Sequence, residues 1–261
     1  MKIGFIGCGN MGGALARAAS RVSYVDILLY DLSSERALEL ANEIDGRAVG
    51  LDECASCDVV FLGVKPHLIP GVASSIKEYI SANTVIITMA AGVAISKVTN
   101  ILGDKAKVIR IMPNTPVAYG KGMILYSASS AVCENDLAAF REYMKYAGRL
   151  DLIPESLIDA GSAVSGCGPA FVYMFIEALA DGGVAAGLPR DRAMQYAAET
   201  VIGAATVVLE SGKHPGELKD AVCSPGGSTI EGVLTLEAGS MRGVVSDAVL
   251  SSYEKTKMLG K

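Results

Sequence analysis

The sequence predicts an α/β fold, in which a doubly wound parallel sheet with helices is followed by an all-helical domain. Over the first half of the chain, short apolar β-prone runs alternate with amphipathic segments. A glycine-rich turn follows the first of these runs. After about Glu155 no convincing strand remains, and long Ala-, Gly- and Met-rich segments show helical spacing. We therefore expect two domains, residues 1–155 and 156–261.

The elements of the first domain follow from this alternation. Five apolar runs are expected to form buried strands, at residues 2–7, 25–30, 59–64, 85–89 and 108–112. Amphipathic spacing predicts helices at 10–21, 33–44 and 135–146. An added edge strand is expected at 122–126, and a last strand around 148–154 leads to the boundary.

The second domain is expected to contain only helices. Pro169 suits the first turn of a helix through 170–184, and Gly187-Leu188-Pro189 ends it. A second helix is expected at 190–210 and a short one around 218–222, and two further helical stretches complete the chain.

Composition excludes several classes of protein. The 261 residues are 51% hydrophobic and 20% charged, with six cysteines and a net charge of −5, which argues against disorder, collagen and a disulfide scaffold. Scattered basic residues provide no nucleic-acid surface. We find no signal peptide and no unbroken apolar stretch of about 18 residues, so we expect no membrane partner. The chain is expected to be cytoplasmic, with reduced thiols.

The glycine-rich turn matches the G-x-G-x-x-G pattern between a predicted strand and a predicted helix. Its residues are Gly7, Cys8, Gly9, Asn10, Met11 and Gly12. Such glycines permit a tight turn and a close approach of helix N–H groups to a pyrophosphate. We therefore expect a Rossmann domain that binds a dinucleotide.

Residues after the second strand leave the choice of dinucleotide open. Asp31 could accept hydrogen bonds from a ribose 2′-hydroxyl, which favours NAD. Ser33, Ser34 and Arg36 follow at once and could bind the 2′-phosphate of NADP instead. Asp31 could also simply cap the next helix.

Further candidates follow the next strands, because ligands of open α/β sheets lie at the carboxyl ends of the strands. The loops contain Gly63, Val64, Lys65 and Pro66, then Met89, Ala90 and Ala91, and finally Asn114 and Thr115. Small residues there give room for a nicotinamide, although each loop could be a simple turn.

A second glycine-rich segment, Ser224 to Thr229, lies in the helical domain. Backbone N–H groups at Gly226, Gly227 and Ser228 could form an anion-binding nest, to which the side-chain hydroxyls add donors. Such a nest suits a carboxylate. A helix N-terminus capped by Ser or Thr would produce the same pattern.

Other reactive residues offer no site. Cys54 and Cys57 form a C-x-x-C motif, but it precedes a strand and no second pair supplies metal ligands. His67 and His214 lack partners for a zinc site or a catalytic triad, so we interpret them as turn or cap residues. No metal is expected.

Taken together, the motifs resemble pyrroline-5-carboxylate reductases over essentially the whole chain. The resemblance rests on FIGCGNMG, FLGVKPH, MAAGV, RIMPNTP, SGCGPAFVY, EALADGGVAAGLPR and HPGELKDAVCSPGGSTIEG. It implies hydride transfer from NADPH or NADH to the C=N carbon of Δ1-pyrroline-5-carboxylate, which yields proline.

The resemblance also implies roles for single residues. Ile6 to Gly12 would hold the pyrophosphate, the segment at Ser33 the adenosine ribose, and the loops at 63–66 and 89–91 the rest of the cofactor. Ser224, Gly226, Gly227, Ser228 and Thr229 would bind the substrate carboxylate, with Thr229 near the imine nitrogen. Asp31 departs from the pattern of members that prefer NADPH.

Two alternatives remain at this stage. A 3-hydroxyacid dehydrogenase would share the glycine-rich start but use a lysine on the interdomain helix, and no lysine occurs from Tyr146 to Gly212. A nucleotide-sensing module without turnover would not need the second nest.

The apolar composition of the helical domain predicts that the chain forms an oligomer. Mean hydropathy is +0.37, and residues 156–209 carry only seven charged side chains. Helices with so few charges lack the broad polar face of a monomer. We expect a homodimer through the helical domain, or a higher oligomer built on it.

Overall fold

The computed structural model describes residues 1–259, and this part of the chain divides into two compact units. The first contains residues 1–167 together with the end of the last helix from Ser252, and the second contains residues 168–251. The helix Glu155–Ser165 therefore belongs to the first unit, together with the sheet.

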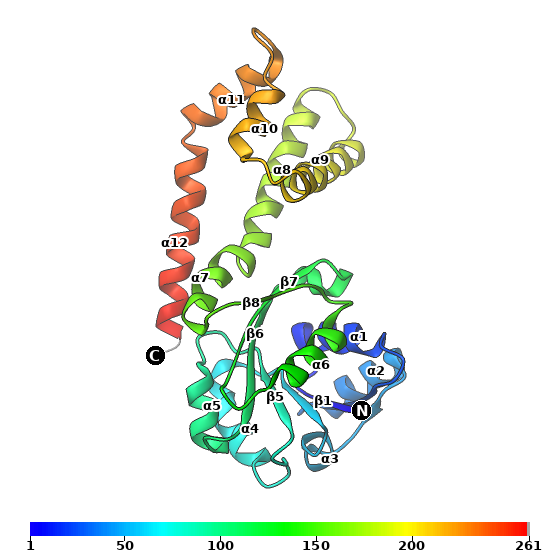
Figure 1. Cartoon of the computed structure of the whole chain (residues 1–261). Coiled ribbons are helices and arrows are strands. Elements are labelled where there is room, and N and C mark those ends of the chain that lie inside the picture. Colours follow the sequence, from blue (N-terminus) through cyan, green and yellow to red (C-terminus); the bar gives the residue numbers. More distant parts are fainter. Residues whose placement is uncertain (260–261) are drawn as a thin grey trace. The chain divides into compact units, whose positions relative to one another are not determined.

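A sheet flanked by helices forms the centre of the first unit (Figure 1). It has eight strands in the order β3-β2-β1-β4-β5-β6-β7-β8. The strands are β1 (Lys2–Ile6), β2 (Asp26–Tyr30), β3 (Arg47–Ala48), β4 (Val59–Leu62), β5 (Val85–Thr88), β6 (Lys107–Pro113), β7 (Gly122–Ala128) and β8 (Gly148–Leu152). All neighbours pair in parallel except β6 and β7. The expected α/β class is confirmed. β7 is not an edge strand, because β8 continues the sheet beyond it.

Helices cover both faces of this sheet. They are α1 (Asn10–Ser20), α2 (Ser34–Ile44), α3 (Leu51–Ala55), η1 (Pro66–Leu68), α4 (Ile69–Ile76), α5 (Ile95–Leu102), η2 (Thr115–Tyr119), α6 (Glu134–Met144) and α7 (Glu155–Ser165). Alternate residues of each strand enter different cores: Ile87 packs with the core under α1 and α6, and Ile86 with the core under α4 and α5. β4 and β5 are therefore buried throughout, as parallel strands with two covered faces must be.

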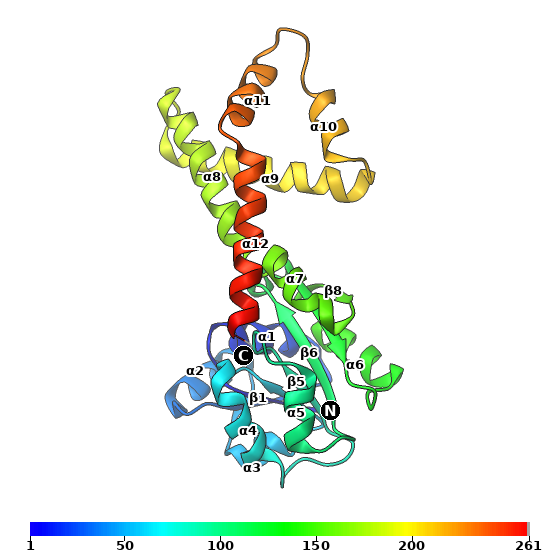
Figure 2. The same ribbon diagram turned by 90° about the vertical axis from the view of Figure 1, so that its left-hand side faces the viewer.

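The second unit is helical, as expected. Its elements are α8 (Gly168–Ala185), α9 (Arg190–Ser211), α10 (Pro215–Ala221), α11 (Ser228–Ala238) and the first part of α12 (Met241–Leu259). Figure 2 shows α10 and α11 as separate short helices joined by a loop. Only Ala180, Ala193 and Ala197 are buried among residues 168–251. Three alanines form a very small core for a unit of this length.

One helical run in the described chain, Glu155–Ala185, is long and apolar enough to cross a membrane, judged by length and composition alone. Its mean hydropathy is 1.4, and 11% of the apolar window is buried. The run is not an unbroken apolar stretch of the kind excluded above, because Asp159 and Glu177 interrupt it. A single such helix is weak evidence for a membrane, because core and interface helices of water-soluble proteins share these properties.

Candidate functional site

The expected glycine-rich turn forms a tightly packed cradle at the carboxyl end of β1. A Cβ atom on Gly12 would lie 2.1 Å from the carbonyl oxygen of Gly7, and one on Gly63 would lie 2.7 Å from the same oxygen. Gly7 has a φ of +99°, which favours glycine. A Cβ on Gly9, by contrast, would meet no atom within 4 Å. Gly7, Gly12 and Gly63 thus allow the backbones of three segments to pack closely, and Gly9 leaves open space at the N-terminus of α1.

The other residues of this turn surround the cradle. Ile6 ends β1 and is buried, Cys8 is buried, Asn10 begins α1 and is exposed, and Met11 is half-buried. The α1 N-cap makes no side-chain hydrogen bond. Its first N–H groups therefore remain available to an anionic ligand.

Asp31 fastens the cradle to the end of β2. Its Oδ2 accepts a hydrogen bond from the Cys8 N–H at 2.8 Å, and its Oδ1 accepts one from the Ser33 N–H at 2.9 Å. The Arg36 guanidinium lies 3.6 Å from Oδ1. Ser33, and not Asp31, is the N-cap of α2, and Ser34 is its first residue. The simple capping role is thus filled by Ser33, and the Asp31 carboxylate links two loops.

Two further loops lie at the same edge of the sheet as the cradle. β4 and β5 follow β1 in the strand order, so Gly63–Pro66 and Met89–Ala91 continue this edge. Gly63 is half-buried beside the cradle, Lys65 is exposed, and Pro66 begins η1. Ala90 is buried, with the half-buried Met89 and Ala91 on either side. The structure therefore brings together the candidates that follow β1, β2, β4 and β5.

Asn114 follows β6, and its side-chain amide already forms hydrogen bonds with other residues of the protein. Its Nδ2 donates to the carbonyl oxygen of Ser165, and its Oδ1 accepts from the Met123 N–H, both at 2.8 Å. Asn114 is buried. One amide hydrogen remains for a ligand.

The thiols of the first unit's core are not reactive groups. Burial, followed by the neighbouring Asp31 charge, raises the pKa of Cys8 to about 12, and burial raises the pKa of Cys57 to about 11. Cys54 is fully buried, and the pKa of its thiol is also raised by burial. All six cysteines are free. The C-x-x-C motif therefore has the properties of a structural core.

Both histidines occupy turn or cap positions, as expected. His67 lies in the short helix η1, and His214 is the N-cap of α10, where its Nδ1 accepts a hydrogen bond from the Gly216 N–H at 3.0 Å. Within residues 1–259 no cluster of three His, Cys, Asp or Glu side chains is arranged to hold a metal ion.

The Ser224–Thr229 segment, in the second unit, forms a tight turn into α11. The Gly227 N–H donates to the carbonyl oxygen of Ser224, and Gly226 between them has a φ of +68°. A Cβ on Gly227 would lie 2.4 Å from Ser224 Oγ. Ser228 and Thr229 are the exposed first residues of α11, whose N-cap makes no side-chain hydrogen bond. The alternative of a Ser or Thr side-chain cap is not observed, because the N-cap is Gly227, so the first N–H groups of α11 remain available.

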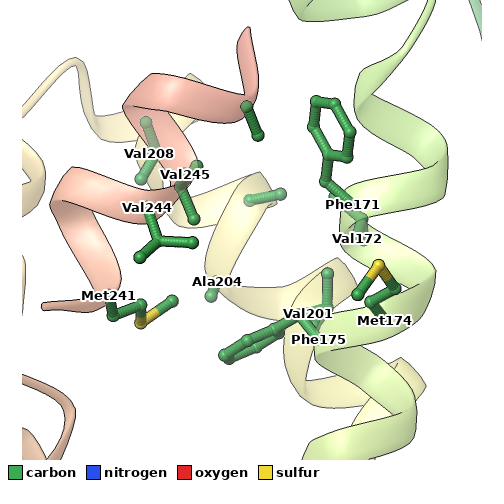
Figure 3. Close-up of a pocket in the computed structure, with 12 residues that line it drawn as sticks. Phe171, Val172, Met174, Phe175, Val201, Ala204, Val208, Met241, Val244 and Val245 are labelled. Atoms are coloured by element: carbon green, nitrogen blue, oxygen red, sulfur yellow. The ribbon is translucent and has the colours of Figure 1, made fainter. Parts of the chain in front are cut away.

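A groove of about 620 Å³ crosses α8, α9 and α12 in the second unit (Figure 3). Its lining is entirely apolar and consists of Phe171, Val172, Met174, Phe175, Val201, Ala204, Ala205, Val208, Met241, Val244, Val245 and Ala248. Several of these side chains are largely exposed, including Met174 at 70% and Val244 at 62%. Such a surface favours burial against another apolar surface.

Sequence reasoning missed one charged cluster. Arg110 of β6 is 3% exposed and contacts Glu155 and Asp159 of α7. An arginine inside the apolar run VIRIMP was the available signal, because a buried cation requires partners.

Comparison with known proteins identifies the family. The chain is 39% identical to pyrroline-5-carboxylate reductase of Escherichia coli, over 100% of this chain and 98% of that protein. It is 38% identical to the enzyme of Pisum sativum, with 98% and 95% covered. The chain belongs to the pyrroline-5-carboxylate reductase family.

Family models and a solved structure agree with this assignment. Residues 155–259 match the pyrroline-5-carboxylate reductase dimerisation model, and residues 2–92 match the model described as coenzyme F420-dependent NADP oxidoreductase. The crystal structure of the Plasmodium falciparum pyrroline carboxylate reductase with NADP bound is 32% identical, with a TM-score of 0.90 and coverage of 100% and 98%. The reductase family thus accounts for both predicted domain types.

Proposed function

We propose that this protein reduces Δ1-pyrroline-5-carboxylate to L-proline with NADH or NADPH as the hydride donor. The observation that carries this proposal is the 39% identity to the E. coli reductase over the full length of both chains. In this proposal the cradle would bind the pyrophosphate of the cofactor, and the turn before α11 would bind the carboxylate of the substrate.

The geometry of the cradle fits a dinucleotide. Close contacts among Gly7, Gly12 and Gly63 bring β1, α1 and β4 together, while the open space at Gly9 leaves a path to the N-terminus of α1. Free N–H groups there would bind the pyrophosphate. Ser33 and Ser34 would contact the adenosine ribose, and the loops at 63–66 and 89–91 would contact the nicotinamide end. When bound, the reduced nicotinamide supplies the hydride.

The charge of Asp31 bears on the preference between NADH and NADPH. Its carboxylate accepts hydrogen bonds from two backbone N–H groups and lies near Arg36, so it is held at the end of β2. A carboxylate there favours a ribose 2′-hydroxyl, whereas Arg36 and the Ser33 and Ser34 hydroxyls favour a 2′-phosphate. We propose that both NADH and NADPH are used, with Asp31 weakening the second.

The turn before α11 suits the substrate carboxylate. The N–H groups of Ser228 and Thr229 lie in the first turn of α11, where the helix dipole favours a negative charge. Ser224, Gly226 and Gly227 shape the turn. We propose that the Thr229 hydroxyl donates a hydrogen bond to the imine nitrogen.

This chemistry needs positioning more than a strong acid. The hydride adds to the imine carbon, the C=N π electrons become an N–H bond with one proton from solvent, and the nicotinamide is oxidised. A protonated cyclic imine is already electrophilic, so one hydrogen-bond donor and the correct distance suffice. No His, Lys or Glu general acid is needed.

We also propose a cytoplasmic homodimer that forms through the helical unit. Only three alanines are buried among residues 168–251, while the apolar groove of Figure 3 remains open. The family model for residues 155–259 describes dimerisation. The apolar run at 155–185 is then explained by a subunit interface instead of a membrane, and the six free thiols suit a reducing compartment.

Loss of absorbance at the reduced nicotinamide band tests the proposed function. Purified protein is given Δ1-pyrroline-5-carboxylate with NADH or NADPH, and turnover is expected with both. Thr229→Ala should lower kcat by about 100-fold with little change in cofactor affinity. Thr235→Ala is the matched control, because the Thr235 hydroxyl donates a hydrogen bond to the carbonyl oxygen of Glu231 within the same helix. No turnover with either cofactor would favour a 3-hydroxyacid dehydrogenase or a nucleotide sensor.

A further inference from the structure

The strongest unexplained polar feature of the first unit is the buried Arg110. Its Nη1 lies 3.3 Å from Glu155 Oε1, and its Nη2 lies 2.5 Å from Asp159 Oδ1. Its Nε has no hydrogen-bond partner within the described residues. Glu155 and Asp159 lie four residues apart on α7, so they share one face of the helix. The burial of Arg110 is therefore offset mainly by two carboxylates of a single helix.

Glu155 also performs a second task. The same Oε1 atom accepts a hydrogen bond from the Ile95 N–H at 2.7 Å. Ile95 is the first residue of α5, whose N-cap Ala94 has no side chain that can accept a hydrogen bond. A carboxylate from α7 thus supplies the cap that the local sequence of α5 lacks, at the end of the helix where its dipole favours a negative charge.

This hydrogen bond fixes one end of the loop that follows β5. The segment that contains Met89–Ala91 begins after Thr88, the last residue of β5, which the parallel sheet holds on both sides. It ends at Ile95, the first residue of α5, which Glu155 holds. The far end of α7 is also tied to β6, through Asn114 and the Ser165 carbonyl. α7 is therefore fastened at both ends to the strand beside that loop.

From these contacts, we propose that Glu155, held by Arg110, is a positioning residue that sets the Met89–Ala91 loop for cofactor binding. The inference rests on the proposed function, which assigns that loop to the nicotinamide end of the cofactor. An apolar cluster of similar volume could replace Arg110, Glu155 and Asp159 together with little loss of stability. It could not accept the Ile95 N–H, which is why we assign a positioning role to the carboxylate.

Three variants of the full-length protein separate positioning from stability. Glu155→Ala removes both the cap of α5 and a partner of Arg110. Glu155→Gln keeps a weaker, neutral acceptor. Asp159→Asn, the matched control, weakens the other contact of Arg110 and keeps the hydrogen bond between Glu155 and the Ile95 N–H.

Two measurements are made on each variant: the Kd for NADPH and NADH by fluorescence titration, and amide hydrogen exchange of the segment 89–95. Glu155→Ala should raise the Kd about fivefold, the value of one lost helix cap, and speed exchange in this segment. Glu155→Gln should lie between wild type and Glu155→Ala. Asp159→Asn should keep wild-type Kd and exchange, even if its melting temperature falls.

A merely structural role predicts a different pattern. If Glu155 only balances the charge of Arg110, the Glu155 and Asp159 variants lose thermal stability alike and keep the wild-type Kd, which would overturn the inference. Should Glu155→Ala fail to fold, the comparison of Glu155→Gln with Asp159→Asn decides, and equal Kd and exchange in those two contradict the proposal. If the wild type itself neither binds nor oxidises NADPH or NADH, the proposed function fails instead.

Discussion

Replacing Gly12 by alanine should destabilise the fold, whereas the same change at Gly9 should not. A Cβ on Gly12 would lie 2.1 Å from the Gly7 carbonyl oxygen, which is backbone and cannot rotate away. A Cβ on Gly9 would meet nothing within 4 Å. The two glycines of one motif therefore serve different purposes: Gly12 permits close packing, and Gly9 leaves space for the ligand.

The size of the effect follows from this contact. An ordinary carbon-to-oxygen contact is well over 3 Å, so Gly12→Ala forces the N-terminus of α1 away from β1 by about 1 Å. Overpacking of a close-packed interior costs about 1–3 kcal/mol. Gly9→Ala adds a methyl group in open space and should change the free energy of unfolding by less than about 0.5 kcal/mol.

Cofactor binding, unlike stability, should be weakened by the substitution at Gly9. The methyl group at Gly9 occupies the space through which the pyrophosphate would approach the α1 N–H groups. Gly9→Ala should therefore weaken NADPH and NADH binding by tenfold or more, about 1.4 kcal/mol. Gly12→Ala should weaken binding as well, because it displaces the same helix end.

Urea unfolding and fluorescence titration of both variants provide the assay. The expected result is a destabilised Gly12 variant and a stable Gly9 variant that binds poorly. If Gly12→Ala matches the wild type in stability, the close packing against Gly7 is not a constraint. If Gly9→Ala binds cofactor normally, the open space is not the pyrophosphate site.

Three further outcomes follow from charge and burial. Asp31→Asn should shift the kcat/KM ratio toward NADPH by about fivefold, since a carboxylate near a phosphate costs about 1 kcal/mol; an unchanged ratio would show that Asp31 does not face the ribose. Because burial raises the pKa of Cys8 to about 12, a thiol reagent at neutral pH should label the exposed Cys133 and leave Cys8 unlabelled until the protein is unfolded. Burial alone would raise the pKa of Asp136, but hydrogen bonds from the Cys133 N–H and the Lys107 ammonium lower this pKa below the ordinary value of an aspartate. Asp136→Asn should therefore cost about 1 kcal/mol at pH 7, and urea unfolding should show this difference fading as the pH falls through the lowered pKa of Asp136, where the wild-type carboxylate gains its proton.

Local sequence patterns determined most of the first unit. β1, α1, β2 and α2 lie within about one residue of their expected bounds, because hydrophobic periodicity and glycine turns are local features. The short helices α4 and α5 were not predicted individually. Each has eight residues, and α5 depends on the distant Glu155 for its cap.

Long-range contacts lay beyond the sequence patterns. The tie between Asp31 and the Cys8 N–H spans 23 residues, and that between Ile95 and Glu155 spans 60. Neither leaves a periodic pattern. The commitment of the Asn114 side chain to Ser165 and Met123 is of the same kind. Sequence could thus propose which loops gather at the sheet edge, but not which of their polar atoms are already bonded to protein.

The most direct test of the central claim follows the hydride itself. Purified protein is incubated with Δ1-pyrroline-5-carboxylate and NADPH or NADH carrying deuterium at the transferable position of the nicotinamide, and the product is analysed by mass spectrometry and NMR. We expect L-proline with one deuterium on the ring carbon that was doubly bonded to nitrogen. Proline without deuterium, or no proline with either cofactor, would contradict the account.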